Sequence, residues 1–399
     1  MKILQICFRM PYPLKDGGAV AMHNMTKGFY ENNVDVTVLY FNTPKHTFYK
    51  NQIPDFMNNW ATWIEASIDT RIKPLKAFFN LFTSKSYNIE RFRSSAVSGK
   101  LKKLLSTEKF DIIHFEGLYT SLYIDLVKEY APESKTSLRQ HNIEYKIWER
   151  LAQNESGVKK WYLQLLAGRL KKFEKRITQK FDLVVPITKV DEEIVKGWNI
   201  ENVFTSSTGV DLEKFIPNNS QQEDQSVFHL GSLDWMPNQQ GLKWFLDEVW
   251  PQVHAKNSLV KFYVAGRSTP EWVRNYHQKQ NVIVSGEVPD AVQFMNSKAI
   301  MVIPLRSGSG MRIKLIEGMS LGKSIVTTSI GAEGVDCVHQ KHVLVANSGE
   351  EFASAILELL KNKPKKMKLE QNACILVEEK YNNKQKVVEL LQKYQALTA

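Results

Sequence analysis

The chain has 399 residues, of which 43% are hydrophobic and 24% charged, a composition that favours a globular protein of two domains, with three as the alternative. Its 53 basic and 42 acidic residues give a net charge of +11, which favours an anionic partner such as a phosphorylated ligand, an acidic membrane surface or a nucleic acid. The three cysteines, Cys7, Cys337 and Cys374, form neither a disulfide framework nor a CxxC zinc motif, and they indicate a reducing compartment.

The first predicted element is a strand at 2–7 that leads into a proline-containing loop. The apolar run at the N-terminus is too short for a signal peptide, and Arg9, Pro11 and Pro13 interrupt it. No apolar run approaches the ~20 residues that a membrane-spanning helix needs. The sequence therefore predicts a soluble cytoplasmic protein, with peripheral attachment to the inner face of the cell membrane as the alternative.

Short apolar runs alternate with segments of helical periodicity along most of the chain. Such runs, rich in β-branched residues and separated by helices, are typical of parallel strands buried on both faces. They fall into two series, so we predict an α/β protein with two doubly wound, Rossmann-like domains. The predicted strands are 2–7, 34–40, 111–115, 135–138 and 182–187, followed by 226–230, 260–266, 281–286, 299–305, 324–328 and 342–345.

A polar, turn-rich stretch at 216–226 separates the two series, and a strand pattern restarts directly after it. We therefore place the first domain at 1–215 and the second at 216–378. Residues 379–399 are predicted to form a terminal helix that either stays exposed or packs back on the first domain.

The strongest chemical signal is PLRSGSGMRIKLIEGMSLGK at 304–323. A predicted strand ends there, a glycine-rich loop allows close approach of the backbone to a ligand, and the N-terminus of the following helix suits an anion. Arg312 and Lys314 are cations at a helix end that disfavours each by up to ~1 kcal/mol, so an anionic ligand would explain them. Glu317, one turn later, suits hydrogen bonds from ribose hydroxyls. An amphipathic surface helix with solvated charges is the alternative.

This stretch, continued through SIVTTSIGAEGV, resembles the donor-binding signature of the retaining glycosyltransferases of family 4, which have the GT-B fold. The stretches LRQHNIEY, HLGSLDWMPNQQGL, VAGR and VSGEVPD and the order of the domains extend the resemblance along most of the chain. It implies two Rossmann-like domains facing across a cleft, with the acceptor on the first and a nucleotide-diphosphate sugar on the second. It also implies hexosyl transfer to a hydroxyl group with retention, in cell-surface polysaccharide or glycolipid biosynthesis.

The chain departs from the family pattern at the first of two glutamates that many members separate by seven residues. The second glutamate corresponds to Glu317, but Ser309 occupies the first position. Ser309, or the backbone amides of Gly310 and Met311, would then contact the donor sugar. A subgroup with RxKxxE in this stretch shares the departure.

A second departure concerns the diphosphate. Many members carry an Arg and a Lys after the first strand of the second domain, where this chain reads GSLDWMPNQQG. Arg267, Arg312 and Lys314 are the candidate replacements, and a solvated role is the alternative for Arg267. By resemblance, the backbone at Glu287 and Val288 reads the nucleobase edge; a simple turn is the alternative.

In the first domain, Asp16, Gly17 and Gly18 follow the first predicted strand. Two glycines before a helix again suit a close approach to a ligand, and a plain strand-to-helix turn is the alternative. The resemblance places the glycines near the donor phosphate and Asp16 near the acceptor.

Polar residues also follow two later strands of this domain, at the carboxyl ends where open α/β sheets bind ligands. We predict that His114 acts in catalysis with Arg312, Lys314 and Glu317, and that four further residues contact the acceptor or sugar. A structural hydrogen bond is the alternative for each histidine. By resemblance, the departing phosphate helps to deprotonate the acceptor, so the protein supplies positioning and charge stabilisation. The four further residues are Glu116, His141, Asn142 and Glu144.

We expect no metal and no cofactor, because the His and Glu residues fit no compact zinc spacing and the chain lacks Asp-x-Asp.

Residues 158–180 carry eight Lys or Arg and one Glu around an apolar stripe. Such a helix either binds an anionic membrane or packs on the sheet with a solvated cationic side. Nucleic-acid binding is not expected, because no known reader motif occurs.

Two other functions of this fold remain open. A nucleotide-sugar epimerase or hydrolase would consume donor without acceptor. A non-catalytic nucleotide-sugar-binding protein would bind donor without turnover, and the missing first glutamate and missing Arg–Lys pair leave room for it.

Overall fold

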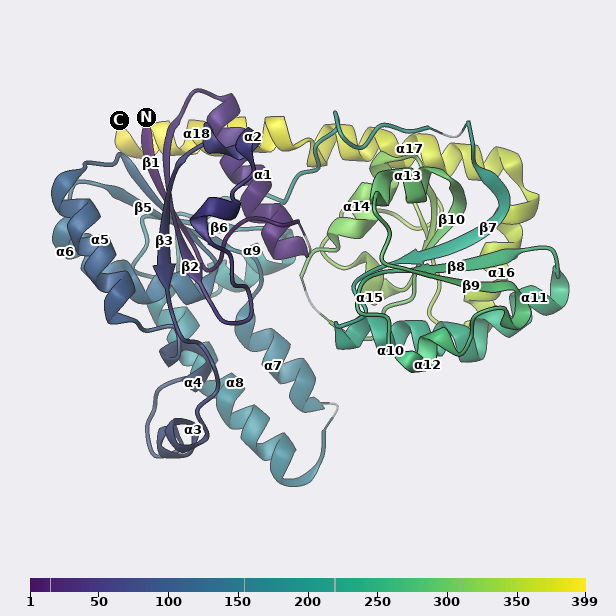
Figure 1. The fold of residues 1–399 in the computed structure, drawn as a ribbon, viewed down its shortest axis with the longest axis horizontal. Helices are drawn as coiled ribbons and strands as arrows, with labels where there is room; N and C mark the ends of the chain where they lie inside the picture. Colours follow the sequence, from purple (N-terminus) through teal and green to yellow (C-terminus); the bar gives the residue numbers. More distant parts are fainter. Residues whose placement is uncertain (15, 154, 219, 309) are drawn as a thin grey trace. The chain divides into compact units, whose positions relative to one another are not determined.

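The computed structural model describes residues 1–14, 16–153, 155–218, 220–308 and 310–399, which form two compact units. The first unit contains 1–208 together with 384–399, and the second contains 209–383. Each unit is built on one six-stranded sheet with helices packed against it (Figure 1). The predicted α/β fold with two doubly wound parallel sheets is therefore confirmed.

The first sheet has the strand order β3-β2-β1-β4-β5-β6, and every neighbouring pair is parallel. The sequence analysis missed β3, an edge strand with only two buried residues in six, so its apolar run is too short to stand out. The strands are β1 (Lys2–Cys7), β2 (Asp35–Asn42), β3 (Thr62–Ser67), β4 (Ile112–Glu116), β5 (Lys135–Gln140) and β6 (Leu183–Pro186).

Helices cover both faces of the first sheet, and alternate residues of its strands enter two cores. Leu4 and Ile6 of β1 pack in a core with α5, α6 and α8, whereas Ile3 and Cys7 pack in a second core with α1 and α18. The α-helices of this unit are α1 (Gly17–Glu31), α2 (Asp55–Asn58), α3 (Pro74–Asn80), α4 (Tyr87–Glu90), α5 (Ser95–Thr107), α6 (Ile124–Tyr130), α7 (Glu144–Gln153), α8 (Gly157–Thr178), α9 (Lys189–Lys196) and α18 (Asn383–Thr398), the last contributing its residues from Lys384 onward.

The second sheet has the order β12-β11-β10-β7-β8-β9 and is again parallel. Its strands are β7 (Glu223–Leu230), β8 (Lys261–Ala265), β9 (Val282–Gly286), β10 (Lys298–Ile303), β11 (Ser324–Thr327) and β12 (Leu344–Val345). Its α-helices are α10 (Met236–Trp244), α11 (Trp250–Lys256), α12 (Glu271–Arg274), α13 (Ala291–Asn296), α14 (Ile313–Ser320), α15 (Ser329–Ala332), α16 (Gly349–Lys361) and α17 (Lys363–Tyr381).

Local sequence signals set several of these helix boundaries. At the start of α16, the Ser348 hydroxyl accepts a hydrogen bond from the Glu351 amide at 3.2 Å, and the Glu351 carboxylate accepts one from the Ser348 amide at 3.3 Å. This reciprocal capping box satisfies two amides that the first turn leaves without helical partners. No helix in the described part of the chain combines the length and apolarity that a bilayer crossing requires.

Candidate functional site

Each sheet reverses its strand order at one place, and open α/β sheets bind ligands beside the carboxyl ends of the strands at that place. In the second unit the reversal lies between β7 and β10, and in the first unit between β1 and β4. The segments after these four strands contain much of the predicted site. The sheet topology therefore gives a physical reason for the concentration of polar residues and glycines there.

The loop after β10 has a backbone that requires glycine. Gly308 has φ +116° and Gly310 has φ +79°, a region that side-chain-bearing residues rarely adopt. A Cβ at Gly308 would lie 2.9 Å from a guanidinium nitrogen of Arg312 and 3.2 Å from the Trp235 ring. Ser309, which was predicted to contact the donor sugar, lies outside the described residues.

Helix α14 carries the three charged residues predicted for this site. Arg312 is its N-cap residue and is 8% exposed, with the guanidinium carbon 5.6 Å from the centre of the Trp235 ring. Lys314 is 43% exposed and its Nζ lies 2.6 Å from Oε2 of Glu317, whose side chain is 5% exposed. The sequence therefore brings a buried cation, an exposed cation and a nearly buried carboxylate to the first two turns of one helix. We call this loop and these residues the β10–α14 clamp.

The loop after β7 packs against the clamp. The Ser307 hydroxyl donates to the Gln240 side-chain carbonyl at 2.9 Å, and the Asn238 amide group donates to the Ser232 carbonyl at 2.8 Å. A Cβ at Gly241 would lie 2.4 Å from the Pro304 carbonyl oxygen, so α10 can approach the end of β10 only because this position is glycine. The stretch WMPNQQG therefore holds the two loops of the switch point together.

Arg267 lies beside the same β7 loop. Its Nε donates to the Ser232 hydroxyl at 2.6 Å, and its Nη2 lies 3.5 Å from an Asp234 carboxylate oxygen. Glu287 is exposed and Val288 half-buried after the edge strand β9, which β8 separates from β7. Among the described residues, Arg267 is thus the predicted donor-binding residue after β8 and β9 whose side chain contacts a loop of the switch point.

His229, near the end of β7, was missed in the sequence analysis. It is buried, and its Nδ1 lies 3.3 Å from the Val302 carbonyl oxygen of β10. Its Nε2 has no hydrogen-bond partner among the described residues, and a Cβ at Gly231 would lie 3.1 Å from that atom. Burial lowers the pKa of His229 to about 4, so a neutral imidazole occupies the switch point. The signal available in the sequence was a histidine two residues before the glycine of HLGSL.

In the first unit, Asp16 is engaged by its own chain. Its Oδ1 accepts hydrogen bonds from the amides of Gly18 at 3.0 Å and Ala19 at 3.2 Å, so it caps α1. Arg9, which the sequence analysis did not assign, donates to both carboxylate oxygens. Burial would raise the pKa of Asp16, but the Arg9 guanidinium holds it below its usual value. Asp16 therefore organises the Gly17–Gly18 turn from within.

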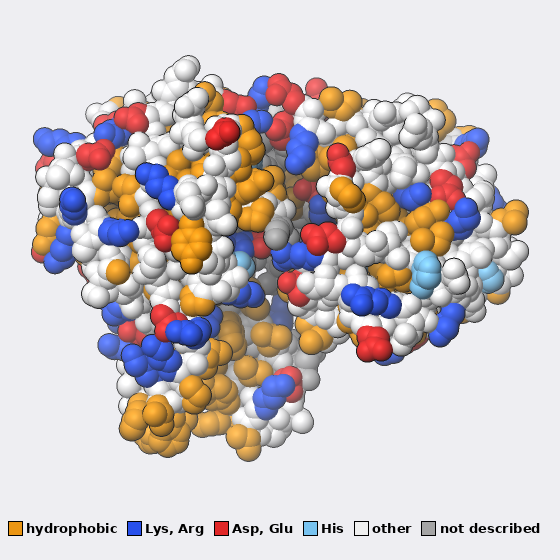
Figure 2. Space-filling model, in the orientation of Figure 1, with side chains coloured by type: hydrophobic (Ala, Val, Ile, Leu, Met, Phe, Trp, Pro, Cys, Tyr) orange, Lys and Arg blue, Asp and Glu red, His pale blue; other side chains and the backbone are white. Residues whose placement is uncertain are grey.

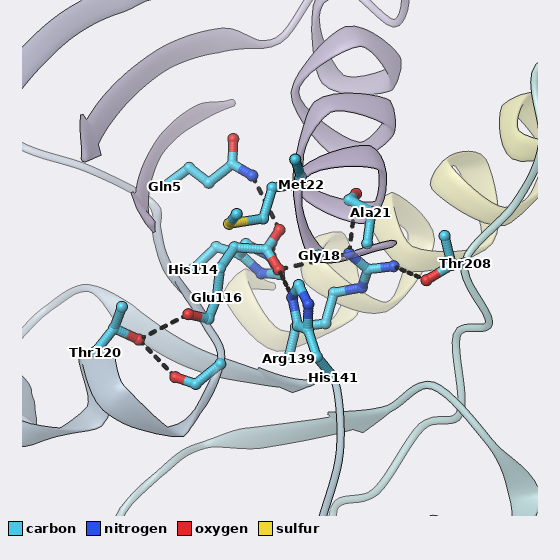
Figure 3. Close-up of polar contacts among 12 residues, drawn as sticks. Gln5, Gly18, Ala21, Met22, His114, Glu116, Thr120, Arg139, His141 and Thr208 are labelled. Carbon is cyan, nitrogen blue, oxygen red and sulfur yellow. Dashed lines mark hydrogen bonds and ion pairs between the residues drawn. The ribbon is translucent and has the colours of Figure 1, made fainter. Parts of the chain in front are cut away.

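Glu116, at the end of β4, is the centre of a buried polar network (Figure 3). Its Oε1 accepts a hydrogen bond from Gln5 at 2.9 Å and lies 3.1 Å from His114 Nε2. Its Oε2 lies 2.6 Å from His141 Nε2 and 3.4 Å from Arg139 Nη1. Burial alone would raise the pKa of Glu116, but Arg139 and the histidines hold it well below its usual value. An ionised carboxylate therefore sits beneath the end of β4.

Arg139 of β5 was also missed in the sequence analysis, although it has the role of counter-ion. It is buried, and it donates to the Ala21 carbonyl at 3.1 Å and to the Thr208 hydroxyl at 3.2 Å, as Figure 3 shows. These contacts connect the carboxyl ends of β4 and β5 with α1. A buried ion pair of this kind is costly to break from one side, because the remaining charge is left uncompensated.

The two predicted histidines differ in their surroundings. His114 is fully buried, with Nδ1 2.6 Å from the Tyr394 hydroxyl of α18 and Nε2 facing Glu116. His141 is 9% exposed, and burial lowers its pKa against the opposing effect of Glu116. Both ring nitrogens of His114 have partners inside the unit, which favours the structural alternative for His114. His141 is the less completely buried of the two histidines.

Within the described part of the chain, the side chains of Asn142 and Glu144 make contacts other than those of the Glu116 network. The Glu144 carboxylate accepts a hydrogen bond from the Tyr119 hydroxyl at 2.9 Å, and burial raises its pKa. Asn142 is half-buried and interacts with the Glu144 carboxylate. The predicted residues of 141–144 therefore take part in two separate sets of contacts: His141 contacts Glu116, and Glu144 contacts Tyr119.

The basic segment 158–180 lies largely in helix α8. Leu166, Leu170 and Ile177 of its apolar stripe are buried in the unit, and Tyr162 and Phe173 are half-buried. This burial favours the packed-helix alternative, and six of the eight cations of 158–180 are exposed. Among the described residues, no group of three or more His, Cys, Asp or Glu is arranged to hold a metal ion.

Comparison with known proteins finds a family model in the second unit and a relative that spans nearly the whole chain. Residues 224–362 match the family model described as Glycosyl transferases group 1. A protein of Klebsiella pneumoniae, described as an uncharacterized 44.6 kDa protein in the cps region, is 23% identical over 400 residues, which cover 96% of this chain and 97% of the relative.

Solved structures resemble the whole chain at low identity. Sucrose-phosphate synthase from Thermosynechococcus elongatus has a TM-score of 0.70 at 13% identity, with 99% of this chain and 98% of that chain covered. TarM of S. aureus, in a complex that includes UDP, has a TM-score of 0.71 at 13% identity, with 99% and 100% covered. HepE of Anabaena in complex with UDP has a TM-score of 0.67 at 13% identity, with 98% and 100% covered. The chain therefore has the GT-B fold, and most of its second unit is similar to the glycosyl transferases of group 1.

Proposed function

We propose that this protein is a glycosyltransferase that moves a sugar from a nucleotide-diphosphate donor to a hydroxyl group of a glycan or lipid-linked acceptor, with retention of configuration. The observation that carries the proposal is the β10–α14 clamp. It combines a glycine-dependent loop, a buried cation and a nearly buried carboxylate at the switch point of a unit that matches the group 1 family model.

The clamp suits the two ends of a nucleoside diphosphate. Arg312 and the amides of Gly310 and Met311 would bind the diphosphate at the N-terminus of α14. Lys314 would add a second charge, and its partner Glu317 would accept hydrogen bonds from the ribose hydroxyls. Arg267 would approach the diphosphate from the β7–β8 side. In this proposal, cations from α14 and from the loop after β8 take the place of the missing Arg–Lys pair of the family pattern.

The chemical step needs little from the protein beyond charge and position. The bond between the anomeric carbon and the diphosphate oxygen breaks, and the acceptor oxygen forms the new bond on the same face of the sugar. The acceptor proton passes to the departing diphosphate, so no separate general base is required. Arg312 and Lys314 stabilise the negative charge that develops on the leaving group. This charge stabilisation is what the clamp contributes to the rate.

On the first unit, we assign His141 to the acceptor or sugar. The Glu116 carboxylate would fix the neutral tautomer of His141 with the proton on Nε2, which leaves Nδ1 to accept a hydrogen bond from a sugar hydroxyl. The α1 N-terminus with Gly17 and Gly18 would lie near the donor phosphate. His114 then supports Glu116 from the buried side and is a positioning residue.

The relatives suggest which donor and which acceptor class to test first. The TarM and HepE structures contain UDP, and another HepE structure contains UDP-glucose, which supports a uridine nucleotide as the first donor to test. The relative from the cps region supports surface polysaccharide or glycolipid assembly. A lipid-linked acceptor would place the enzyme at the cytoplasmic face of the membrane, where the cationic side of 158–180 would face anionic lipid. We propose neither a metal nor an organic cofactor.

A turnover screen tests the proposal. The purified full chain is incubated with UDP-, GDP-, ADP-, dTDP- and CMP-sugars, with and without a membrane-lipid extract from the source organism, and the released nucleotide is quantified. We expect release from one donor, and we expect the extract to increase it. The triple variant Arg312→Ala, Lys314→Ala, Glu317→Ala should lose this release, whereas Lys243→Ala, an exposed cation on α10 of the same unit, should retain it.

Three other outcomes would contradict the proposal. Equal release with and without the extract would indicate an epimerase or hydrolase of this fold. Donor-specific binding without release, lost in the triple variant, would indicate a nucleotide-sugar-binding protein. Release that the triple variant retains would show that the clamp is not the donor site.

A further inference from the structure

Residues 69–86 form an excursion of the chain that begins and ends at the hydrophobic core of the first unit. Ile68 before this excursion and Ile89 after it are both in the hydrophobic core. Between them, five large apolar side chains are 55% to 77% exposed, namely Ile72, Leu75, Phe78, Phe79 and Phe82. We call these five residues, on and around α3, the apolar knob. Figure 2 shows orange side chains gathered at the lower left, where Figure 1 places α3.

The knob has a defined structure even though the core does not cover it. The Lys73 amide donates to the Tyr87 hydroxyl at 2.8 Å, which ties the start of the excursion to its end. Arg169 of α8 donates to the Asn80 carbonyl at 2.9 Å and the Leu81 carbonyl at 2.8 Å, which fixes the far end of α3. The Phe78 ring packs edge-on against Phe79 and Phe82 rather than against the core. The exposed rings are therefore held outward by the fold.

The charges around the knob select its partner. Residues 70–86 contain the cations Arg71, Lys73, Lys76 and Lys85 and no acidic residue. Arg71 and Lys73 share Asp69 as an ion-pair partner, and Lys76 and Lys85 are exposed. A symmetric contact between two copies would bring these cations together, whereas an anionic bilayer attracts them.

We propose that the apolar knob inserts into the headgroup region of an anionic phospholipid bilayer, with the surrounding cations on the lipid phosphates. Aromatic and aliphatic side chains beside Lys and Arg are the combination that peripheral proteins use at this depth. This membrane site differs from the helix at 158–180 that the sequence suggested, because the apolar stripe of that helix is buried or half-buried. The knob lies in the first unit and its lipid binding does not rest on the proposed glycosyl transfer.

Vesicle co-sedimentation of the full chain tests the knob. The vesicles contain phosphatidylcholine alone or phosphatidylcholine mixed with phosphatidylglycerol. We expect binding to the mixed vesicles, weakened by salt, and about tenfold or more weaker binding to phosphatidylcholine alone. The triple variant Phe78→Ser, Phe79→Ser, Phe82→Ser should lower the partition coefficient about tenfold or more. The matched triple Leu259→Ser, Val338→Ser, Met367→Ser removes similarly exposed apolar groups of the second unit. This control should leave the partition coefficient unchanged.

A charge variant keeps the test independent of the aromatic residues. Lys76→Glu with Lys85→Glu should abolish the preference for anionic vesicles, and Lys361→Glu with Lys368→Glu, exposed cations of the second unit, should leave it unchanged. Hydrogen exchange in the presence of vesicles should show new protection in 70–86.

Two results would overturn the inference. In the first, the full chain and both knob variants bind the vesicles equally well, or none of the three binds them. The other is self-association without lipid, measured by sedimentation, that the aromatic variant abolishes, since this would make a second copy the partner.

Discussion

At the scale of single residues, the structure shows different surroundings for side chains that occupy similar positions in the sequence pattern. His114 and His141 both lie near the carboxyl ends of strands of one sheet, yet His114 is fully buried with a partner on each ring nitrogen, whereas His141 is 9% exposed. The sequence could predict the β10–α14 clamp because its residues are neighbours along the chain. It could not predict Arg139 as the counter-ion of Glu116, or Tyr394 as the partner of His114, because 23 and 280 positions separate these pairs.

The two histidines give a prediction that separates structure from function. His141→Asn should lower kcat or raise KM for the acceptor about tenfold or more, and it should reduce the free energy of unfolding by only about 1 kcal/mol, because Glu116 keeps its other partners. His114→Phe should reduce the free energy of unfolding by about 1–3 kcal/mol, because it leaves the buried Tyr394 hydroxyl and Glu116 with fewer partners. Steady-state kinetics and urea denaturation measure the two effects. The reverse pattern would return the catalytic assignment to His114.

The buried imidazole of His229 predicts a dependence of stability on pH. Its pKa is about 4 in the folded chain and about 6.5 in an unfolded chain. The unfolded state therefore binds the proton first, so stability is complete above pH ~6.5 and falls as the pH is lowered toward 4. The contribution is about 3 kcal/mol at most. Urea denaturation between pH 7 and 4 should show a shallower fall for His229→Gln than for the natural chain, and equal slopes would refute the prediction.

At the scale of elements, caps and glycines position the loops at the two switch points. Asp16 ends the loop after β1 and starts α1, while Gly231, Gly266 and Gly308 allow contacts that a Cβ would block. Sequence patterns predicted the buried central strands well, because their runs are continuous and β-branched. They missed the edge strand β3, whose outer residues are exposed. The positive φ of Gly308 could not be read from the sequence, because SGSG is compatible with several loop conformations.

Replacing the cap of α1 tests this positioning. Asp16→Ala removes the acceptor of the Gly18 and Ala19 amides and leaves Arg9 without its carboxylate partner. We expect a loss of about 1–2 kcal/mol in the free energy of unfolding, measured by urea denaturation. Asp16→Asn keeps a capping oxygen and should recover part of the loss. Equal losses in the two variants would mean that the Arg9 ion pair, and not the cap, provides the stabilisation.

At the scale of the whole molecule, the chain leaves the first unit after Thr208 and returns to it at Lys384. The returning helix α18 packs with α1 in the second core of the first unit, and a Cβ at Gly28 of α1 would lie 2.4 Å from Val387. The sequence predicts a terminal helix at 379–399, and α18 spans Asn383–Thr398. Its packing depends on the fit between α18 and a glycine more than 300 residues earlier in the chain, which no local pattern encodes.

Because α18 packs in the first unit, we predict that this unit does not fold without residues 384–399. Deleting 384–399 removes four buried side chains, Val387, Leu390, Leu391 and Tyr394. At about 1.5–3 kcal/mol each, their loss is of the same size as the 5–15 kcal/mol that stabilises a typical domain. In calorimetry, the truncated chain should lose the unfolding transition of the first unit and keep that of the second, and limited proteolysis should degrade 1–208 first. A chain that ends after Gln395 keeps all four side chains and is the control. Two intact transitions in the longer deletion would show that α18 is an accessory of the first unit and that its sheet and remaining helices are sufficient for folding.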